Sequence, residues 1–267
     1  MSDGVLRVER DGPVARVTFT RSAVRNAFNA EMIDSLAAVF AGFAHEPAES
    51  LRAVVLAGEG PSFCAGADVE WMRAAAAMTE EANRADAGWM AAMLNLIDTC
   101  PAPVVARVHG AALGGGVGLC AVSDVVIATR DTVFGFTETK LGLIPSVISL
   151  FVLPKIGETW ARALYPGGSR FDAERAREIG LVHAVVADEP ALDRRLADVL
   201  DELLSVGPNA ARAAKALVRE LRGLSPQDAW AVAVSSIAAQ RVTPEAQEGL
   251  SAFLGKRAAR WRRPSGG

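Results

Sequence analysis

The sequence predicts an α/β fold that is followed by a helical C-terminal region. A buried strand, a glycine-rich loop and a helix follow one another twice along the chain, around Gly66 and around Gly115. Strands that alternate with helices are typical of α/β proteins. The last quarter of the chain has the apolar periodicity of helices throughout. We therefore divide the chain into a core, residues 1–206, and a helical region, residues 207–267.

The first half begins with a predicted β-hairpin, because apolar segments flank the turn Asp11-Gly12-Pro13. Asn29 has the character of a helix N-cap and precedes an amphipathic segment. The elements predicted up to residue 98 are strands at 5–9 and 15–20, a helix at 30–44, a strand at 52–57, and helices at 69–73 and 89–98.

The second half repeats the strand and helix alternation before the chain becomes all helical. The elements predicted up to residue 186 are strands at 104–108 and 125–129, an extended or turn segment at 133–142, an apolar run at 143–153, helices at 158–165 and 170–179, and a strand at 181–186. Helices are predicted after that at 192–205, 209–221, 226–239 and 244–256.

Composition indicates a soluble globular protein that needs no disulfide or metal to support its core. The chain has 267 residues, of which 51% are hydrophobic and 22% are charged. No uninterrupted apolar run approaches the ~20 residues of a membrane span, and the first ten residues lack the features of a secretory signal. The net charge of -3 argues against broad nucleic-acid binding, although basic residues cluster between Lys256 and Arg263.

The three cysteines predict a reducing compartment. Cys64, Cys100 and Cys120 are an odd number without CxxC spacing, which is typical of free thiols and offers no zinc site. We therefore expect a cytoplasmic protein without a bound metal.

The stretch from Pro103 to Ala121 organises the rest of the chain. A short apolar strand leads into Gly114, Gly115 and Gly116, which open a buried helix. Glycine lets a ligand approach the backbone closely, and the first amides of a helix lack internal partners and carry a positive field. Two such loops can stabilise the oxyanion of a thioester enolate by roughly 3 to 4 kcal/mol per important donor.

Four ordered motifs resemble those of the enoyl-CoA hydratase/isomerase (crotonase) superfamily. They are FCAGADVEWM at 63–72, HGAALGGGVGL at 109–119, FGFTETKLGLIP at 134–145 and RFDAERAREIGLVHAVV at 170–186. The resemblance implies a spiral of repeated ββα units with a C-terminal helical trimerisation region. It also implies an enzyme of fatty-acid or branched-chain degradation that adds water to, or removes it across, the C2=C3 bond of a 2-enoyl-CoA through a stabilised thioester enolate. Coenzyme A is then part of the substrate, and no separate cofactor is expected. GLIPSVIS and GADVEWM are most similar to methylglutaconyl-CoA hydratase-type members.

The resemblance assigns roles to particular positions. It implies that Ala67 and Gly115 supply the two oxyanion-hole amides and that Glu138 is the acid/base. The second glutamate of the hydratases falls at Gly118, where we expect a side chain to project toward the oxyanion site. The remaining positions implied to contact substrate or coenzyme A are Arg25, Ala27, Ala65, Asp68, Gly114, Gly118 and Lys256. Asp68 is also a candidate helix cap and His109 a candidate loop brace.

Three other functions have to be weighed against hydration. A single carboxylate at Glu138 suits a Δ3-Δ2-enoyl-CoA isomerase, which moves one proton between carbons. The missing carboxylate at Gly118 is also compatible with a non-catalytic acyl-CoA-binding protein, although Glu138 opposes it. A dinucleotide-binding oxidoreductase would use Gly116, Gly118 and Ala121, but the segment before the next strand is too short for a parallel crossover.

The C-terminal helices predict self-association. Apolar stripes on them have no sheet of their own to cover, and their members are Leu217, Leu221, Trp230, Val234, Ile237, Leu250 and Phe253. We expect a second copy of the chain to cover them, in the homotrimer or homohexamer that the resemblance implies.

Overall fold

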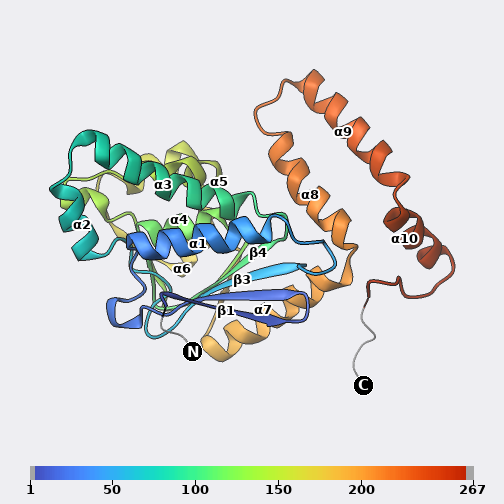
Figure 1. The fold of residues 1–267 in the computed structure, drawn as a ribbon, viewed down its shortest axis with the longest axis horizontal. Helices are drawn as coiled ribbons and strands as arrows, with labels where there is room; N and C mark the ends of the chain where they lie inside the picture. The colour runs from blue at the N-terminus through green and yellow to red at the C-terminus, as the bar shows by residue number, and fades with distance from the viewer. Residues whose placement is uncertain (1–3, 263–267) are drawn as a thin grey trace.

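The computed structural model describes residues 4–262 and contains a six-stranded sheet with helices on both faces (Figure 1). The strand order is β1-β2-β3-β4-β6-β9, and every neighbouring pair except β1 and β2 is parallel. The strands are β1 (Leu6–Asp11), β2 (Val14–Phe19), β3 (Ala53–Gly58), β4 (Val104–Val108), β6 (Val125–Thr129) and β9 (Ala184–Val186).

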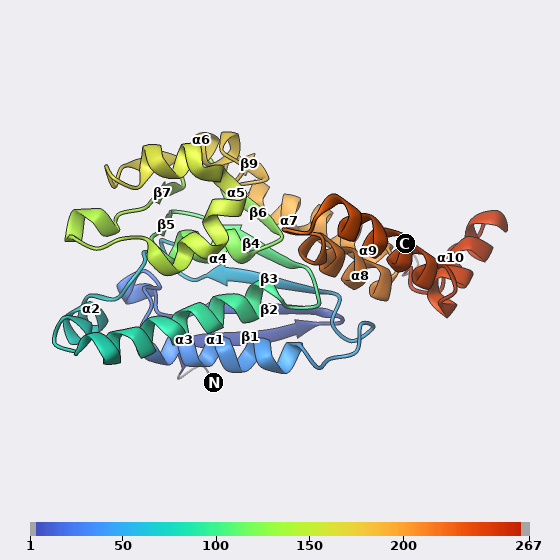
Figure 2. The same cartoon turned by 90° about the horizontal axis from the view of Figure 1, so that it is seen from above.

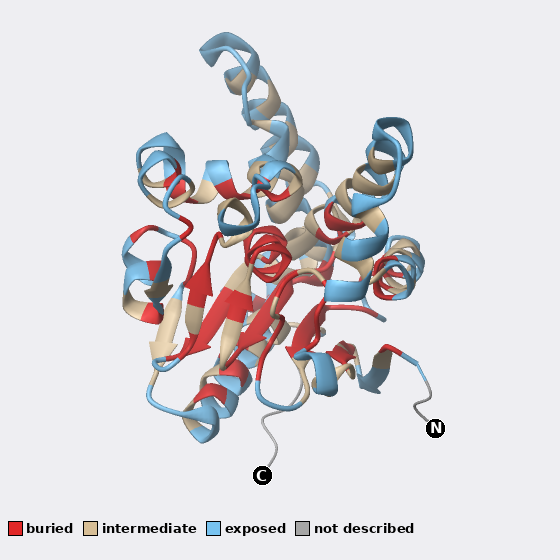
Figure 3. Ribbon diagram, turned by 90° about the vertical axis from the view of Figure 1, so that its left-hand side faces the viewer, coloured by how far each residue is buried: buried red, intermediate tan, exposed pale blue. Residues whose placement is uncertain are grey.

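The central strands are nearly continuous runs of valine, isoleucine, leucine and alanine, because helices bury both of their faces. One face packs under α1 (Ala30–Phe43), α3 (Glu80–Asp98), α4 (Gly115–Val122) and α5 (Ser146–Leu164), as Figure 2 shows. The other face packs on α7 (Glu189–Ser205) through Leu192, Leu196 and Val199. Figure 3 shows the large sheet and the helix at the centre of the molecule as its most buried parts.

A second, three-stranded sheet makes the chain a spiral. It contains β5 (Ala111–Leu113), β7 (Val133–Gly135) and β8 (Arg170–Asp172). Two pairs of consecutive strands, β4 with β5 and β6 with β7, each contribute their first strand to the large sheet and their second strand to the small sheet. A helix follows each pair. An isolated parallel β-bridge pairs Cys64 with Ala112 of β5. The segment after β3 therefore also passes from the large sheet to the small sheet before α2 (Val69–Ala76) begins. The repeated ββα unit is therefore present in the structure.

Several predicted elements differ from the structure. The segment 170–179, which was predicted as one helix, is β8 followed by α6 (Ala173–Glu178), and the strand predicted at 181–186 is limited to β9. The helix predicted at 89–98 begins nine residues earlier, at Glu80, where Thr79 caps it. The apolar run at 143–153 and the helix at 158–165 are two parts of α5, separated by a kink at Gly157.

The last helices form an arm that stands away from the core (Figure 1). The helical arm consists of α8 (Pro208–Glu220), α9 (Pro226–Arg241) and α10 (Pro244–Leu254), each with proline in its first turn. Arg212 and Lys215 tie α8 to the core, the first by bonds to the carbonyls of Glu46 and Leu51 and the second by an ion pair with Asp124. The arm therefore has polar anchors at its base.

The arm leaves large apolar side chains uncovered. Trp230 is 75% exposed and Phe253 is 81% exposed, which agrees with the predicted apolar stripes. The outer ends of the two predicted regions, residues 1–3 and 263–267, lie outside the described residues. Arg263 of the basic cluster is among them. Between residues 4 and 262, no helix is long and apolar enough to cross a membrane.

Candidate active site

The two glycine-rich loops meet at the carboxyl ends of β3 and β4. These strands are parallel neighbours, with Val54 opposite Val104, so the loops that follow them leave the same edge of the sheet. Cys64 and the β5 strand exchange backbone hydrogen bonds, from Cys64 N to Ala111 O (3.0 Å) and from Leu113 N to Cys64 O (3.0 Å). The loops are therefore fixed against each other by the sheet itself.

Each of the three consecutive glycines faces a different neighbour. A Cβ on Gly114 would lie 3.1 Å from Glu138 Oε1, on Gly115 2.8 Å from the Phe28 ring, and on Gly116 2.4 Å from Cys64 O. Gly114 also has a positive φ of 49°, a conformation that side chains other than hydrogen disfavour. The triplet is thus required by close packing on three sides.

The two predicted oxyanion donors have no backbone acceptor within residues 4–262. Gly115 is the first residue of α4, so its N–H has no partner in the helix. Ala67 pairs with Phe28 in a β-bridge whose hydrogen bonds use Gly66 O and Asp68 N, which leaves the Ala67 N–H without a backbone acceptor. A Cβ on Gly66 would lie 4.0 Å from Gly114 Cα, so the residues that precede both donors are in contact. The two N–H groups without a backbone acceptor therefore belong to residues that follow two neighbouring glycines.

Glu138 begins the short 3-10 helix η2 (Glu138–Leu141), and its carboxylate lies against the second loop. Its Oε1 faces Gly114, and its Oε2 is buried without a hydrogen-bond partner. Burial raises the pKa of Glu138 above its ordinary value, with a smaller opposing effect from a backbone hydrogen bond. A carboxyl with a raised pKa next to free amides suits general acid/base work near neutral pH.

Gly118 faces apolar side chains, which helical spacing alone did not predict. A Cβ at this position would lie 2.6 Å from Ile148 Cγ2 and 3.6 Å from Leu94 Cδ1. Ile148 is buried on α5 and Leu94 on α3. The volume that a second catalytic carboxylate would enter is therefore filled by apolar side chains.

Four of the positions predicted to bind coenzyme A lie together on two adjoining segments. Ala65 N donates to Arg25 O (3.0 Å), Phe28 N to Gly66 O (2.7 Å), and Asp68 N to Phe28 O (2.8 Å). The segments 25–28 and 65–68 therefore run side by side and bring Arg25, Ala27, Ala65 and Asp68 next to Ala67. Arg25 is exposed and has a left-handed backbone.

Asp68 is the helix cap that its position predicts. Its Oδ1 accepts from Glu70 N (2.8 Å), and its Oδ2 accepts from Arg21 (2.7 Å). The hydrogen bond to Arg21 is the main cause of the lowered pKa of Asp68. Both oxygens therefore hold the start of α2 and the first loop in place.

Two further polar side chains brace the first loop. His109 Nε2 lies 2.8 Å from Gly60 O, as predicted for a loop brace. Asn26 is fully buried and donates to Glu59 O (2.9 Å) and Ser62 O (2.7 Å). Sequence reasoning missed Asn26, although asparagine is one of the few residues that tolerate the positive φ found there.

Lys256 is not brought to the site within one subunit. It follows α10 at the far end of the helical arm, whereas α2 and α4 lie at the other side of the molecule (Figure 1). It is exposed. Its predicted contact with coenzyme A therefore requires another copy of the chain.

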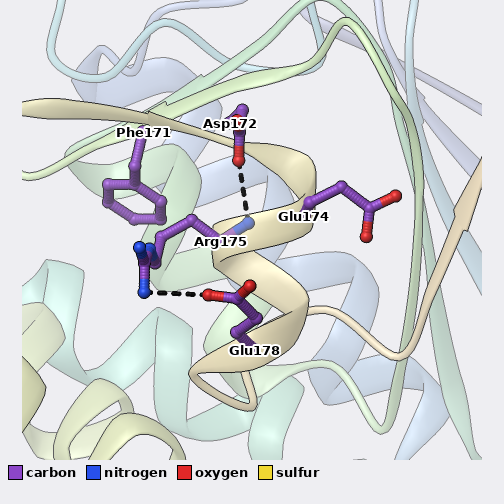
Figure 4. Close-up of a pocket in the computed structure, with 5 residues that line it drawn as sticks. All are labelled: Phe171, Asp172, Glu174, Arg175 and Glu178. Carbon is purple, nitrogen blue, oxygen red and sulfur yellow. Dashed lines mark hydrogen bonds and ion pairs between the residues drawn. The ribbon is translucent and has the colours of Figure 1, made fainter.

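The pocket shown in Figure 4 lies outside this site. It has a volume of about 270 Å³ and is lined by Phe171, Asp172, Glu174, Arg175 and Glu178. Its polar groups serve the local structure, because Asp172 caps α6 and Arg175 pairs with Glu178 at 2.8 Å. Within residues 4–262, no group of three or more histidine, cysteine or acidic side chains could hold a metal ion.

The fold places the chain among enzymes of the crotonase type. The enoyl-CoA hydratase/isomerase family model matches residues 9–264. A solved enoyl-CoA hydratase from Shewanella pealeana is 37% identical, with a TM-score of 0.92 and 97% of each chain covered. The chain therefore belongs to the enoyl-CoA hydratase/isomerase family, and it is an enzyme of the enoyl-CoA hydratase type.

Two curated relatives show the range of reactions in this family. An enoyl-CoA hydratase of Alternaria alternata is 32% identical over 250 residues, which is 92% of this chain and 80% of the relative. A peroxisomal Delta(3,5)-Delta(2,4)-dienoyl-CoA isomerase of Arabidopsis thaliana is 25% identical over 267 residues, covering 96% of this chain and 95% of the relative.

Proposed function

We propose that the protein hydrates the C2=C3 bond of a 2-enoyl-CoA with Glu138 as its sole acid/base. The observation that carries this proposal is the contact between the Glu138 carboxylate and the loop that presents the free Gly115 amide. The amides of Ala67 and Gly115 bind the thioester oxygen, and they bind it more tightly as negative charge develops in the enolate. No metal or separate cofactor takes part, and coenzyme A belongs to the substrate.

One carboxylate is sufficient for the proton balance of hydration. Glu138 takes a proton from water while the hydroxyl adds to C3, and it returns that proton to C2. No net proton is consumed, so the carboxylate is regenerated after each addition. Both transfers occur on the face of the substrate that Glu138 occupies.

We further propose that the substrate is a branched or glutaconyl-type enoyl-CoA of the kind used by methylglutaconyl-CoA hydratases. The motifs GLIPSVIS at 142–149 and GADVEWM at 66–72 support this choice. Packing of Ile148 over Gly118 also supports it, because a site with one carboxylate differs from that of two-glutamate hydratases.

A substrate screen tests this function. We expect faster formation of a 3-hydroxyacyl-CoA from branched or glutaconyl-type thioesters than from straight-chain crotonyl-CoA, measured by loss of the conjugated double bond and by mass spectrometry. Hydration that is fastest on crotonyl-CoA would contradict the substrate class. Double-bond migration without hydration would favour the alternative, an isomerase, to which the Arabidopsis relative gives support.

We propose a homotrimer, or a homohexamer built from two trimers, in which residues 207–267 form the oligomerisation region. Exposure of Trp230, Val234 and Ile237 on α9 and of Phe253 on α10 supports it, because an apolar surface of this kind marks an interface. Lys256 of one subunit then lies beside the coenzyme A phosphates bound by Arg25 of another. Buried free thiols support a reducing, cytoplasmic location.

Sedimentation velocity of the full chain tests the assembly. A single species with three or six times the mass of the chain is expected, and a monodisperse monomer would contradict the proposal. Replacing Phe253 and Trp230 by glutamate together is expected to shift the sample toward smaller species, since buried unpaired charges oppose association. The matched control is the exposed Val8 on β1, where glutamate should leave the mass unchanged.

A further inference from the structure

A reversal of the chain within α5 brings two distant hydroxyl groups together. Ser149 Oγ lies 3.1 Å from the Tyr165 hydroxyl, although sixteen residues separate them. Sixteen residues of straight helix would span ~24 Å. Gly157, with φ 71° and ψ 168°, breaks the helix three residues after Pro154, and this break returns Tyr165 to the first turn of α5.

Tyr165 holds the Glu138 segment from both sides. Its ring packs on Phe136 with ring centroids 4.6 Å apart, and its carbonyl accepts a hydrogen bond from Thr139 Oγ1 at 2.9 Å. The turn after Tyr165 fits equally closely, because a Cβ on Gly168 would lie 2.7 Å from Thr139 Oγ1. Tyr165 therefore fixes Phe136 and Thr139, which lie on either side of Glu138 in the chain.

The phenol is neutral at physiological pH and lies within electrostatic reach of the carboxylate. Burial raises the pKa of Tyr165, and the charge of Glu138 raises it further, against the opposing effect of the Ser149 hydrogen bond. A protonated phenol can donate a hydrogen bond but cannot act as a base. Tyr165 therefore supports the chemistry of Glu138 and does not replace it.

We propose that Tyr165, locked by Ser149 through the kink at Gly157, is the positioning residue that fixes Glu138 for proton transfer. The inference rests on the proposed acid/base role of Glu138. A carboxylate that serves both C2 and the water must be held closely, since a misplacement of ~1 Å can reduce a rate by about 10²-fold. With Gly118 unable to host a second carboxylate, this requirement falls on a single side chain.

Tyr165→Phe tests the hydroxyl, because it keeps the ring on Phe136 and the carbonyl that binds Thr139. We expect kcat to fall about tenfold with KM within about twofold of the wild type. The acidic limb of the kcat profile should move to higher pH, since loss of the hydroxyl makes the surroundings of Glu138 more apolar and burial is what raises its pKa. Ser149→Ala should move the limb in the same direction by less, because the phenol remains.

Phe171→Leu is the matched control. Phe171 packs on Phe136 at a centroid distance of 5.9 Å but belongs to β8, outside the turn that holds Glu138. This variant should lower the melting temperature and leave the pH profile unchanged. If Tyr165→Phe keeps the wild-type kcat and pH profile, the inference is wrong.

A spectroscopic readout separates this inference from the proposed function. Tyr165 is the only tyrosine of the chain, so the ultraviolet signal of phenolate formation reports on it alone. Glu138→Gln should lower the pH at which the phenol ionises, because it removes the negative charge beside it. An unchanged titration would refute the proximity of the two groups even in an active enzyme. Absence of turnover on every thioester, with the shift present, would refute only the proposed function.

Discussion

Replacing Glu138 by glutamine is expected to lower kcat by ~10²- to 10⁴-fold, the range that general acid/base groups contribute. Glutamine keeps the size of the side chain and removes the group that takes and returns the proton. Binding of an acyl-CoA should stay within a few-fold of the wild type, because the variant leaves unchanged the amides of Ala67 and Gly115 that we propose to bind the thioester. Steady-state kinetics and calorimetric binding measure the two effects separately.

Stability provides the internal control for this variant. The pKa of Glu138 is raised in the folded protein, so ionisation above that pKa disfavours the folded state. Glu138→Gln should therefore melt at or above the wild-type temperature at pH 8, and the difference should shrink as the pH falls toward the ordinary range of glutamate. Glu158→Gln, at an exposed ion pair with Arg162, should change neither rate nor stability appreciably. Near-normal turnover by Glu138→Gln would remove Glu138 from the mechanism.

Replacing Gly118 by glutamate alone is expected to destabilise the protein without a gain in hydration. The new Cβ would lie 2.6 Å from Ile148 Cγ2, and overpacking of this kind costs about 1 to 3 kcal/mol. The carboxylate would also be buried among Ile148 and Leu94 without a partner. Chemical denaturation should show the loss directly.

Adding Ile148→Ala to Gly118→Glu should make room for the carboxylate. We expect this double variant to hydrate crotonyl-CoA about tenfold or more faster than the wild type, in line with the contribution of one acid/base group. Gly118→Gln combined with Ile148→Ala has nearly the same volume and no proton to transfer, so it should show no gain. Equal rates in the two double variants would show that space, and not a second acid, limits the reaction.

The sequence was sufficient to predict most of the large sheet because its strands carry a strong local signal. The runs that became β3, β4 and β6 are mostly apolar, as is typical of strands covered on both faces. The three-residue strand β5 carries no such signal, and its pairing with β7 depends on contacts distant in sequence. The kink at Gly157 was likewise hidden, since the apolar segments on either side of it appeared to be separate elements.

The candidate site was predictable where it depends on the backbone and not where it depends on packing between elements. Glycine-rich loops after parallel strands indicate free amides, so Ala67 and Gly115 could be placed from sequence motifs. The packing around Gly118 was not predicted, because helical spacing alone cannot show that side chains of α3 and α5 cover that position. The contacts of Asn26 and Tyr165 span too many residues for any local pattern to indicate them.

Turnover in heavy-oxygen water tests the central claim most directly. If Glu138 delivers the elements of water across C2=C3, a branched or glutaconyl-type enoyl-CoA should yield a 3-hydroxyacyl-CoA that carries the heavy oxygen at C3. The Glu138→Gln variant should form this product at least ~10²-fold more slowly. An unlabelled isomer of the starting thioester, formed by the wild type in place of the labelled hydroxyl product, would contradict the account.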